Sequence, residues 1–202
     1  MHSKTPTTTP ITQHGDIAKL SRLRNRDSHW GYVAVFFHWL VAIAVVGLFA
    51  LGMWMTDLTY YDPWYKQGPD LHKSIGITLL AVYMFRLAWR IWDRAPDALQ
   101  GHSAMEHKAA HTVHWLLYGG LFAVMISGYL ISTADGRAIS VFGVFDIPAT
   151  LTSIAQQEDV AGVVHKWLAI SLVSLAIAHA LAALKHHFID KDTTLKRMFA
   201  RS

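Results

Sequence analysis

Four long stretches with almost no charge constrain this chain more than any other feature of its 202 residues. Residues 33–55, 109–134 and 167–184 contain no Asp, Glu, Lys or Arg over 23, 26 and 18 positions, and 71–92 contains three basic residues. A helix needs about 20 mostly apolar residues to cross a bilayer. Helices buried in a soluble bundle usually carry a polar stripe, which the three uncharged stretches lack. The sequence therefore predicts an all-α integral membrane protein, a bundle of four helices in a lipid bilayer.

The chain divides into three predicted regions. Residues 1–31 form a polar arm with many Thr and Pro residues, which we expect to be disordered. The arm contains no apolar core long enough for a signal peptide. Residues 32–188 form the four-helix membrane domain, and 189–202 form a basic tail.

The positions of the basic residues predict the orientation in the membrane. Of the 18 Lys and Arg residues, 14 fall in the arm, around the second loop or at the C-terminal end, and 4 fall in the other two loops. Because cytoplasmic loops carry the excess of Lys and Arg, both termini are expected to face the cytoplasm. This topology accounts for the formal charge of +4, so no nucleic-acid partner is expected.

The chain has no cysteine but 13 histidines. The missing cysteines exclude disulfides, iron–sulfur clusters, thiolate zinc sites and covalently attached haem c. The histidines then need an explanation, because ionisable residues inside a membrane are usually functional.

Four histidines fall at two depths of the predicted bundle. His165 and His179 are 14 residues apart, which is 40° short of four helical turns, so they share one face about 21 Å apart. His72 opens the second predicted helix at the outer level of His165. His38 lies near the inner end of the first, at the level of His179. Two pairs follow, His72 with His165 and His38 with His179.

Paired imidazoles suit two b-type haems, because low-spin haem iron takes one axial ligand on each side of the ring and needs no covalent attachment. Zinc is disfavoured, because such sites need three or four ligands close together and no membrane Asp or Glu lies beside these pairs. The alternative for any one histidine is a packing or hydrogen-bonding role. Two haems stacked across a bilayer would make a path for electrons.

Other polar residues lie at the same depths. Arg86 follows His72 by 14 residues and could pair with a propionate of the inner haem or extend to the headgroups. His114 could contact a propionate, line a quinone pocket or replace an inner ligand. His186, seven residues after His179, could handle protons near a quinone or lie at a solvated helix end.

Two further features lie near the outer level. Gly76, one turn after His72, could let a haem approach the helix backbone or could serve helix packing. Residues 135–159 are expected to lie on the membrane surface as an amphipathic segment that caps the outer haem.

Six short stretches carry a family resemblance. They are FHWL at 37–40, LHKSIG at 71–76, VHKW at 164–167, AHA at 178–180, HHF at 186–188 and KDTTL at 191–195. In this order they resemble the bacterial cytochrome b561 family, and the best-matched type is superoxide oxidase. The resemblance covers about residues 29–200.

The resemblance implies a four-helix dihaem fold in the bacterial inner membrane, with His38 and His179 on one haem and His72 and His165 on the other. It implies electron transfer with a membrane quinone. In the superoxide oxidase type, superoxide gives an electron at the outer side and ubiquinone accepts it. Other relatives with this fold anchor a hydrogenase or formate dehydrogenase.

The residues leave three functions open. Lys66, Lys73 and Lys166 flank the outer site and could attract the superoxide anion, or could neutralise haem propionates. A relay subunit, which passes electrons between a partner dehydrogenase or hydrogenase and quinone, is the alternative. A non-haem metal transporter is disfavoured, because the membrane carboxylates usual for such paths are missing.

Overall fold

Four long helices form the protein, a computed structural model of which describes residues 23–97, 99, 103–152 and 154–199. They are α2 (Tyr32–Met55), α3 (Gln67–Trp92), α4 (Ala104–Ser132) and α5 (Gln157–Phe188). Their 24 to 32 residues make each helix longer than the roughly 30 Å hydrocarbon core of a bilayer. All four are also apolar enough to cross a membrane. The predicted set of four membrane-spanning helices is confirmed.

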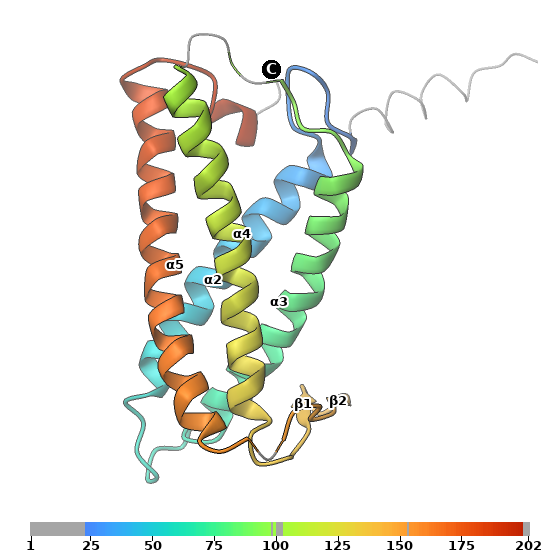
Figure 1. Ribbon diagram of the computed structural model, residues 1–202, viewed down its shortest axis with the longest axis vertical. Helices are drawn as coiled ribbons and strands as arrows, with labels where there is room; N and C mark the ends of the chain where they lie inside the picture. The colour runs from blue at the N-terminus through green and yellow to red at the C-terminus, as the bar shows by residue number, and fades with distance from the viewer. Residues whose placement is uncertain (1–22, 98, 100–102, 153, 200–202) are drawn as a thin grey trace, which may run out of the picture.

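The helices run alternately up and down, so the described chain begins and ends at the same end of the bundle (Figure 1). We call this the termini end and the opposite end, which carries two short strands, the hairpin end. Helix α2 packs mainly against α3, and α4 packs mainly against α5. Each helix runs the full length of the bundle, so side chains from all four helices lie at every depth.

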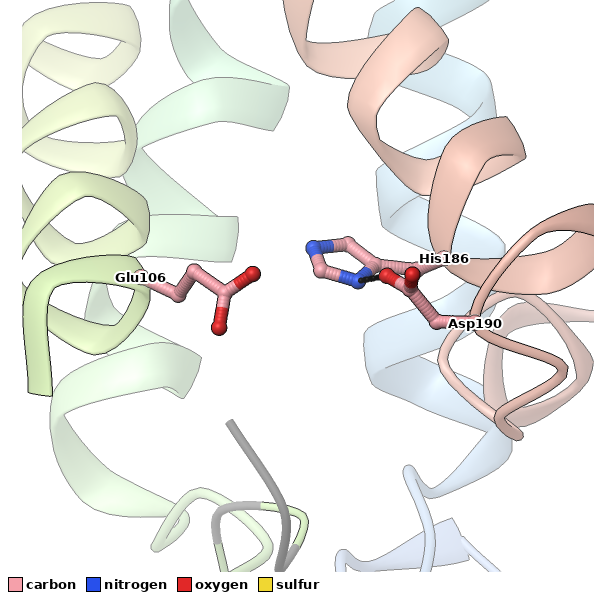
Figure 2. A group of neighbouring side chains, drawn as sticks. All are labelled: Glu106, His186 and Asp190. Atoms are coloured by element: carbon pink, nitrogen blue, oxygen red, sulfur yellow. Dashed lines mark hydrogen bonds and ion pairs between the residues drawn. The ribbon is translucent and has the colours of Figure 1, made fainter. Parts of the chain in front are cut away.

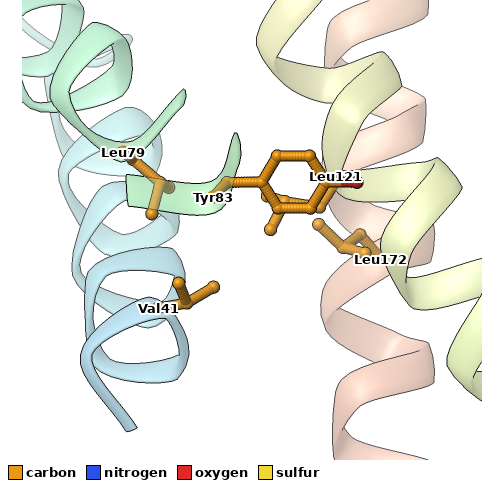
Figure 3. Close-up of a cluster of buried hydrophobic side chains, with 5 residues drawn as sticks. All are labelled: Val41, Leu79, Tyr83, Leu121 and Leu172. Carbon is orange, nitrogen blue, oxygen red and sulfur yellow. The ribbon is translucent and has the colours of Figure 1, made fainter. Parts of the chain in front are cut away.

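A small apolar core lies about midway along the bundle and takes one or two residues from each helix (Figure 3). Its buried members are Val41, Leu79, Tyr83, Leu121 and Leu172. The Tyr83 hydroxyl donates a 3.1 Å hydrogen bond to the carbonyl of Tyr118 on α4, which satisfies its polar group. The core separates the two ends of the bundle.

Large apolar side chains cover the outside of the helices. Ile43 on α2 is 69% exposed and Leu181 on α5 is 59% exposed. Such surfaces are unfavourable in water but suit the lipid chains of a bilayer, which are as apolar as the side chains themselves. The outer surface therefore supports the same conclusion as helix length.

Helix α5 begins ten residues before the uncharged stretch from which it was predicted. Its first turn contains Glu158 and Asp159, whose negative charges favour a helix N-terminus. The absence of charge therefore marked the apolar part of the helix and not its start. As a result His165 lies two turns inside α5 instead of opening it.

At the termini end, the segment before α2 is fastened to the end of α3. Asp93 is 2% exposed, and its carboxylate accepts hydrogen bonds from Arg24 Nε at 3.2 Å and from the backbone N–H of Asn25 at 2.8 Å. A Cβ at Gly31 would collide with the Leu23 carbonyl oxygen and would lie 2.6 Å from the Arg24 carbonyl oxygen, so only glycine fits there. Residues 1–22 of the predicted arm and 200–202 of the tail lie outside the described residues, and the domain boundaries stay a prediction.

The C-terminal segment returns to α2. The short helix η1 (Lys196–Met198) follows α5, and the Met198 carbonyl accepts a 2.9 Å hydrogen bond from Trp39 Nε1. The Phe199 ring lies 4.5 Å from the Trp39 ring, centroid to centroid. Residues 159 positions apart thus meet beside His38.

At the hairpin end, strands β1 (Ile139–Val141) and β2 (Phe145–Ile147) form an antiparallel hairpin where an amphipathic surface segment was expected. Ile139 and Val141 are 3% and 1% exposed, so the first strand packs against the bundle. The location of this segment at the membrane surface stays a prediction. The Ser74 hydroxyl on α3 accepts a 3.0 Å hydrogen bond from the Phe142 N–H. This bond attaches the hairpin to α3 two residues after His72.

Candidate functional site

Two groups of histidines lie at the two ends of the bundle, on either side of the apolar core. The group at the hairpin end contains His72 of α3 and His165 of α5. The group at the termini end contains His38, His114 and His179, one each from α2, α4 and α5, together with Arg86 of α3. The grouping into two depths follows the helix periods.

At the hairpin end, the rings of His72 and His165 lie edge to face, with centroids 6.3 Å apart and planes 74° apart. Metal–imidazole bonds are about 2.0–2.1 Å long. Two such bonds within the 6.3 Å between centroids leave about 1 Å from each nitrogen to the centre of its ring, close to the radius of an imidazole. The pair therefore has the separation expected for two axial imidazoles. The buried His72 Nδ1 has no hydrogen-bond partner among the described residues.

The tautomer of His165 is set by a neighbouring helix. His165 Nδ1 lies 2.9 Å from the carbonyl oxygen of Val124 and 3.1 Å from the Ser127 hydroxyl. A carbonyl can only accept, so Nδ1 carries the proton and donates it. The lone pair of Nε2 is then left for a metal, and the ring is held in position by its other nitrogen. Val124 and Ser127 had no sequence signal that marked them.

Two glycines let these imidazoles lie against helix backbones. A Cβ on Gly52 of α2 would lie 3.3 Å from His72 Cε1. A Cβ on Gly128 of α4 would lie 3.1 Å from His165 Cε1 and 3.3 Å from its Nδ1. Both contacts are tighter than nearly all real Cβ contacts, so a side chain would displace the ring. By contrast, open space surrounds Gly76, which leaves room beside His72.

At the termini end, the ring next to His179 is that of His114, whereas the sequence predicted His38 as its partner. The rings of His114 and His179 lie 5.3 Å apart, centroid to centroid. His38 Nδ1 accepts a 3.0 Å hydrogen bond from Arg86 Nη2. His38 still interacts electrostatically with both His114 and His179. Three imidazoles and one guanidinium thus converge, and His114 belongs to the group.

The lysines at the hairpin end differ in their freedom to attract an anion. Lys73 Nζ lies 2.7 Å from an Asp70 carboxylate oxygen, which compensates its charge. Lys66 and Lys166 are exposed and have no ion pair among the described residues. Nearby, hydrogen bonds from Arg137 lower the pKa of Asp135, so this pair is also neutral overall.

His186 belongs to a charge network at the termini end, drawn in Figure 2 with Glu106 of α4 and Asp190. His186 Nδ1 lies 2.7 Å from Asp190 Oδ2. Lys185 Nζ lies 2.8 Å from the same oxygen and 3.5 Å from Glu106 Oε1. The hydrogen bond from Lys185, and then that from His186, lowers the pKa of Asp190. Because the Lys185 ammonium contacts both carboxylates, this group is an ion-pair network that joins α4 to the end of α5.

A family model described as prokaryotic cytochrome b561 matches residues 29–201. The chain belongs to the prokaryotic cytochrome b561 family. The match covers all four spanning helices, so the chain is an integral, multi-pass membrane cytochrome of an electron-transfer family.

Three relatives agree with this assignment. Cytochrome b561 homolog 2 of Escherichia coli (strain K12) is 54% identical over 178 residues, which are 88% of this chain and 95% of the relative. A Yersinia pestis protein named "Probable superoxide oxidase CybB" is 30% identical over 81% of this chain and 92% of its own length. Cytochrome b561 homolog 1 of E. coli is 27% identical over 83% of this chain and 94% of its own length.

Membership of the cytochrome b561 family implies b-type haem, and the hairpin-end residues fit that group. Two imidazoles lie at a suitable separation, one with its Nε2 lone pair available, and glycines bring both close to the neighbouring helices. His72 and His165 are therefore the residues that would hold a haem at this end.

Proposed function

We propose that this cytochrome b561 holds two b-type haems and transfers electrons from superoxide to ubiquinone. His72 and His165 would hold the haem at the hairpin end, and His38 and His179 the haem at the termini end. The observation that carries the proposal is the His72–His165 pair, with rings 6.3 Å apart and His165 Nδ1 fixed by the Val124 carbonyl. A bound haem supplies a reversible one-electron couple at each site.

The overall reaction balances over two turnovers of the donor. Two superoxide anions each lose one electron and become dioxygen. One ubiquinone takes up the two electrons and two protons and becomes ubiquinol. The protein residues keep the imidazoles oriented, separate the two ends with an apolar core and exclude water from the path between them.

Superoxide as donor is supported by a relative and by two lysines. The relative from Y. pestis carries the name of a superoxide oxidase at 30% identity. Lys66 and Lys166 are exposed at the hairpin end, and Lys166 follows a proposed ligand directly. A local positive patch raises the encounter rate of an anion. The two loops at this end contain 7 acidic and 4 basic residues, so their net charge is negative. Any attraction of superoxide must therefore come from the two lysines near the site and not from the loops as a whole.

The proposed location is the bacterial inner membrane, with both termini in the cytoplasm. The support is the distribution of basic residues, 14 at the termini end and 4 at the hairpin end. Superoxide would then react on the periplasmic side, where the hairpin end lies.

A relay subunit for a partner dehydrogenase or hydrogenase is the second candidate. One surface favours it: an aromatic group in the connection between α2 and α3 is exposed at the hairpin end. Tyr60 is 75% exposed, Tyr61 93% and Trp64 52%. Exposed aromatic residues of this kind are enriched both at protein interfaces and at membrane–water interfaces.

The test uses purified protein in nanodiscs with ubiquinone and no partner protein. We expect two haems b per chain by pyridine haemochrome analysis, reduction of the haem by a superoxide-generating system, and ubiquinol as product. Superoxide-driven reduction should slow as salt is raised, because salt screens the lysines. Haem that superoxide does not reduce, although dithionite does, would favour the relay.

A further inference from the structure

A second arginine lies on the haem-facing side of α3. Arg90 follows His72 by 18 residues, which is five full helical turns, and follows Arg86 by one turn. His72, Arg86 and Arg90 therefore share one face of the helix. Arg86 interacts electrostatically with Arg90, and His114 interacts with both. Arg90 thus faces the same group of histidines as Arg86.

The Arg90 side chain is fixed but not satisfied. Its guanidinium carbon lies 4.9 Å from the centre of the Trp30 ring, which holds it by a cation–π contact. Its Nη1 is buried and has no hydrogen-bond partner within the described part of the chain. A buried charged donor without a partner is costly, so the site calls for an acceptor that the described residues do not supply.

Nearby acidic groups do not neutralise the pair. Asp93 is the carboxylate nearest in sequence to Arg90, and both its oxygens are occupied, by Arg24 Nε and by the Asn25 N–H. Among the described residues, neither Arg86 nor Arg90 forms an ion pair with a carboxylate. Two positive charges therefore lie side by side at a membrane-embedded end of the bundle, where a cation is expected to have a counter-charge.

The hydrogen bond from Arg86 to His38 points to the same missing anion. A guanidinium only donates, so His38 Nδ1 accepts and the proton of the neutral ring lies on Nε2. A metal ligand bound through Nε2 needs that proton on Nδ1 instead. If Arg86 turns to an anion, His38 becomes free to adopt the tautomer that binds a metal.

We propose that Arg86 and Arg90 together bind two anionic oxygen groups at the termini end, and that these are the two propionates of the haem proposed there. This inference rests on the proposed function for the presence of that haem. Guanidinium–carboxylate pairs are charge-assisted and often bidentate, so one arginine per propionate satisfies the charge and the buried Nη1. The phosphate of a membrane lipid has the same chemistry and is the competing source.

The pair should raise the reduction potential of the haem at the termini end. A cation beside an iron centre stabilises the reduced form, which carries one more negative charge. Loss of either arginine should shift that reduction equilibrium about tenfold toward the oxidised form, which is about 59 mV for a one-electron couple. The haem at the hairpin end is about 21 Å away and should keep its potential.

The experiment compares Arg90→Gln, Arg90→Lys and Arg86→Gln with Arg94→Gln. Arg94 is exposed just beyond α3 and makes no contact with the group, so it is the matched control. Both midpoint potentials are measured by optical redox titration, haem is counted by pyridine haemochrome, and bound phospholipid is measured by native mass spectrometry. The haem at the termini end is identified by its absence in His179→Ala.

We expect Arg90→Gln and Arg86→Gln to lower only the potential of the haem at the termini end, Arg90→Lys to recover part of the loss, and Arg94→Gln to change neither potential. Unchanged potentials in Arg90→Gln, with full haem content, would overturn the inference and leave the two-haem proposal standing. Unchanged potentials with loss of bound phospholipid would instead assign the pair to a lipid phosphate. Fewer than two haems in the unmutated chain would overturn the proposed function, and the shift in Arg90→Gln would still decide the role of Arg90 on a haem that remains.

Discussion

At the scale of single residues, the hairpin-end site depends on contacts between a histidine side chain and the backbone of a neighbouring helix. His165 lies against the backbone of α4 at Gly128. Its Nδ1 donates to the Val124 carbonyl and also lies near the hydroxyl of Ser127, three residues after Val124. Backbone groups cannot change rotamer, so they hold the imidazole more firmly than a flexible side chain would. The site therefore tolerates little change in the volume of α4 at this position.

We expect Gly128→Ala to lower the haem content to about one per chain. The new Cβ would lie 3.1 Å from His165 Cε1, so the ring must shift by a few tenths of an ångström, which disturbs its alignment with the Val124 carbonyl. Gly119→Ala on the same helix is the control, because nothing lies within 4 Å of its Cβ. That control should keep both haems and gain up to about 1 kcal/mol of helix stability. Haem content per chain by pyridine haemochrome is the measurement, and equal haem in the two variants would contradict this account of Gly128.

At the scale of elements, polar contacts attach the segments between and after the helices to the helices themselves. The hairpin is attached to α3 through Ser74. In the turn after α5, Asp190 pairs with Lys185 of α5, which also pairs with Glu106 of α4. Both attachments use polar groups at the ends of spanning helices, where the surroundings change from lipid to water. Each can be removed without touching a proposed ligand.

Ser74→Ala should loosen the hairpin by about 1 kcal/mol, the usual net contribution of one hydrogen bond. Ser74 is 2% exposed, and its hydroxyl accepts a hydrogen bond from the Phe142 N–H. In the variant this N–H would lose its partner. Hydrogen exchange at 139–147 should then be faster. Thr78→Ala is the control, because the Thr78 hydroxyl bonds only the carbonyl of Ser74 on its own helix. Unchanged exchange in Ser74→Ala would show that strand packing alone holds the hairpin.

The Asp190 network predicts a pH dependence of stability. The hydrogen bond from Lys185 lowers the pKa of Asp190 below its ordinary value of 3.8. A lowered carboxyl pKa means that the group stabilises the folded state above the unfolded pKa, and that this contribution disappears as pH falls through the folded pKa. Asp190→Asn should therefore lower the melting temperature at pH 6–7, and the difference from wild type should shrink as the pH falls below 3.8.

Thermal unfolding in detergent between pH 3 and pH 7 measures this difference. Asp97→Asn is the control at the same end, because Asp97 makes its described hydrogen bonds through its backbone. A difference between Asp190→Asn and wild type that does not depend on pH would mean that the carboxylate charge has no part in the network.

At the scale of the whole molecule, two proposed sites lie on opposite sides of one apolar core, so they should be separable. His165→Ala should remove the haem at the hairpin end and leave about half of the haem b absorbance, as two separately ligated irons require. Superoxide should then reduce the remaining haem far more slowly, while a quinol analogue still reduces it. His179→Ala should give the reverse, with prompt reduction by superoxide and little transfer to quinone.

Stopped-flow reduction of both variants by superoxide and by quinol checks this route. A wild-type superoxide rate in His165→Ala would contradict entry at the hairpin end. Loss of all haem in both variants would mean that the sites depend on each other. Retention of haem at the termini end in His179→Ala would favour His114, whose ring lies 5.3 Å from that of His179, as the ligand instead.

The sequence by itself determined the features that repeat along a single helix. The uncharged stretches predicted the four spanning helices, which are confirmed, and the 14-residue spacing predicted that His165 and His179 lie on one face at two depths. Both follow from local geometry, 3.6 residues and 5.4 Å per turn, which neighbouring helices hardly alter.

Only the tertiary structure decided which groups on different helices meet. The contacts of His165 with Val124, of His114 with His179 and of Arg86 with His38 depend on how each helix is rotated and where it crosses its neighbours. Those quantities come from packing in three dimensions, and the period of one helix does not contain them. The same reason explains why Arg90 has no carboxylate partner among the residues that the structure describes. Asp93 lies three residues away in sequence, but the fold of 23–31 places Arg24 against that carboxylate.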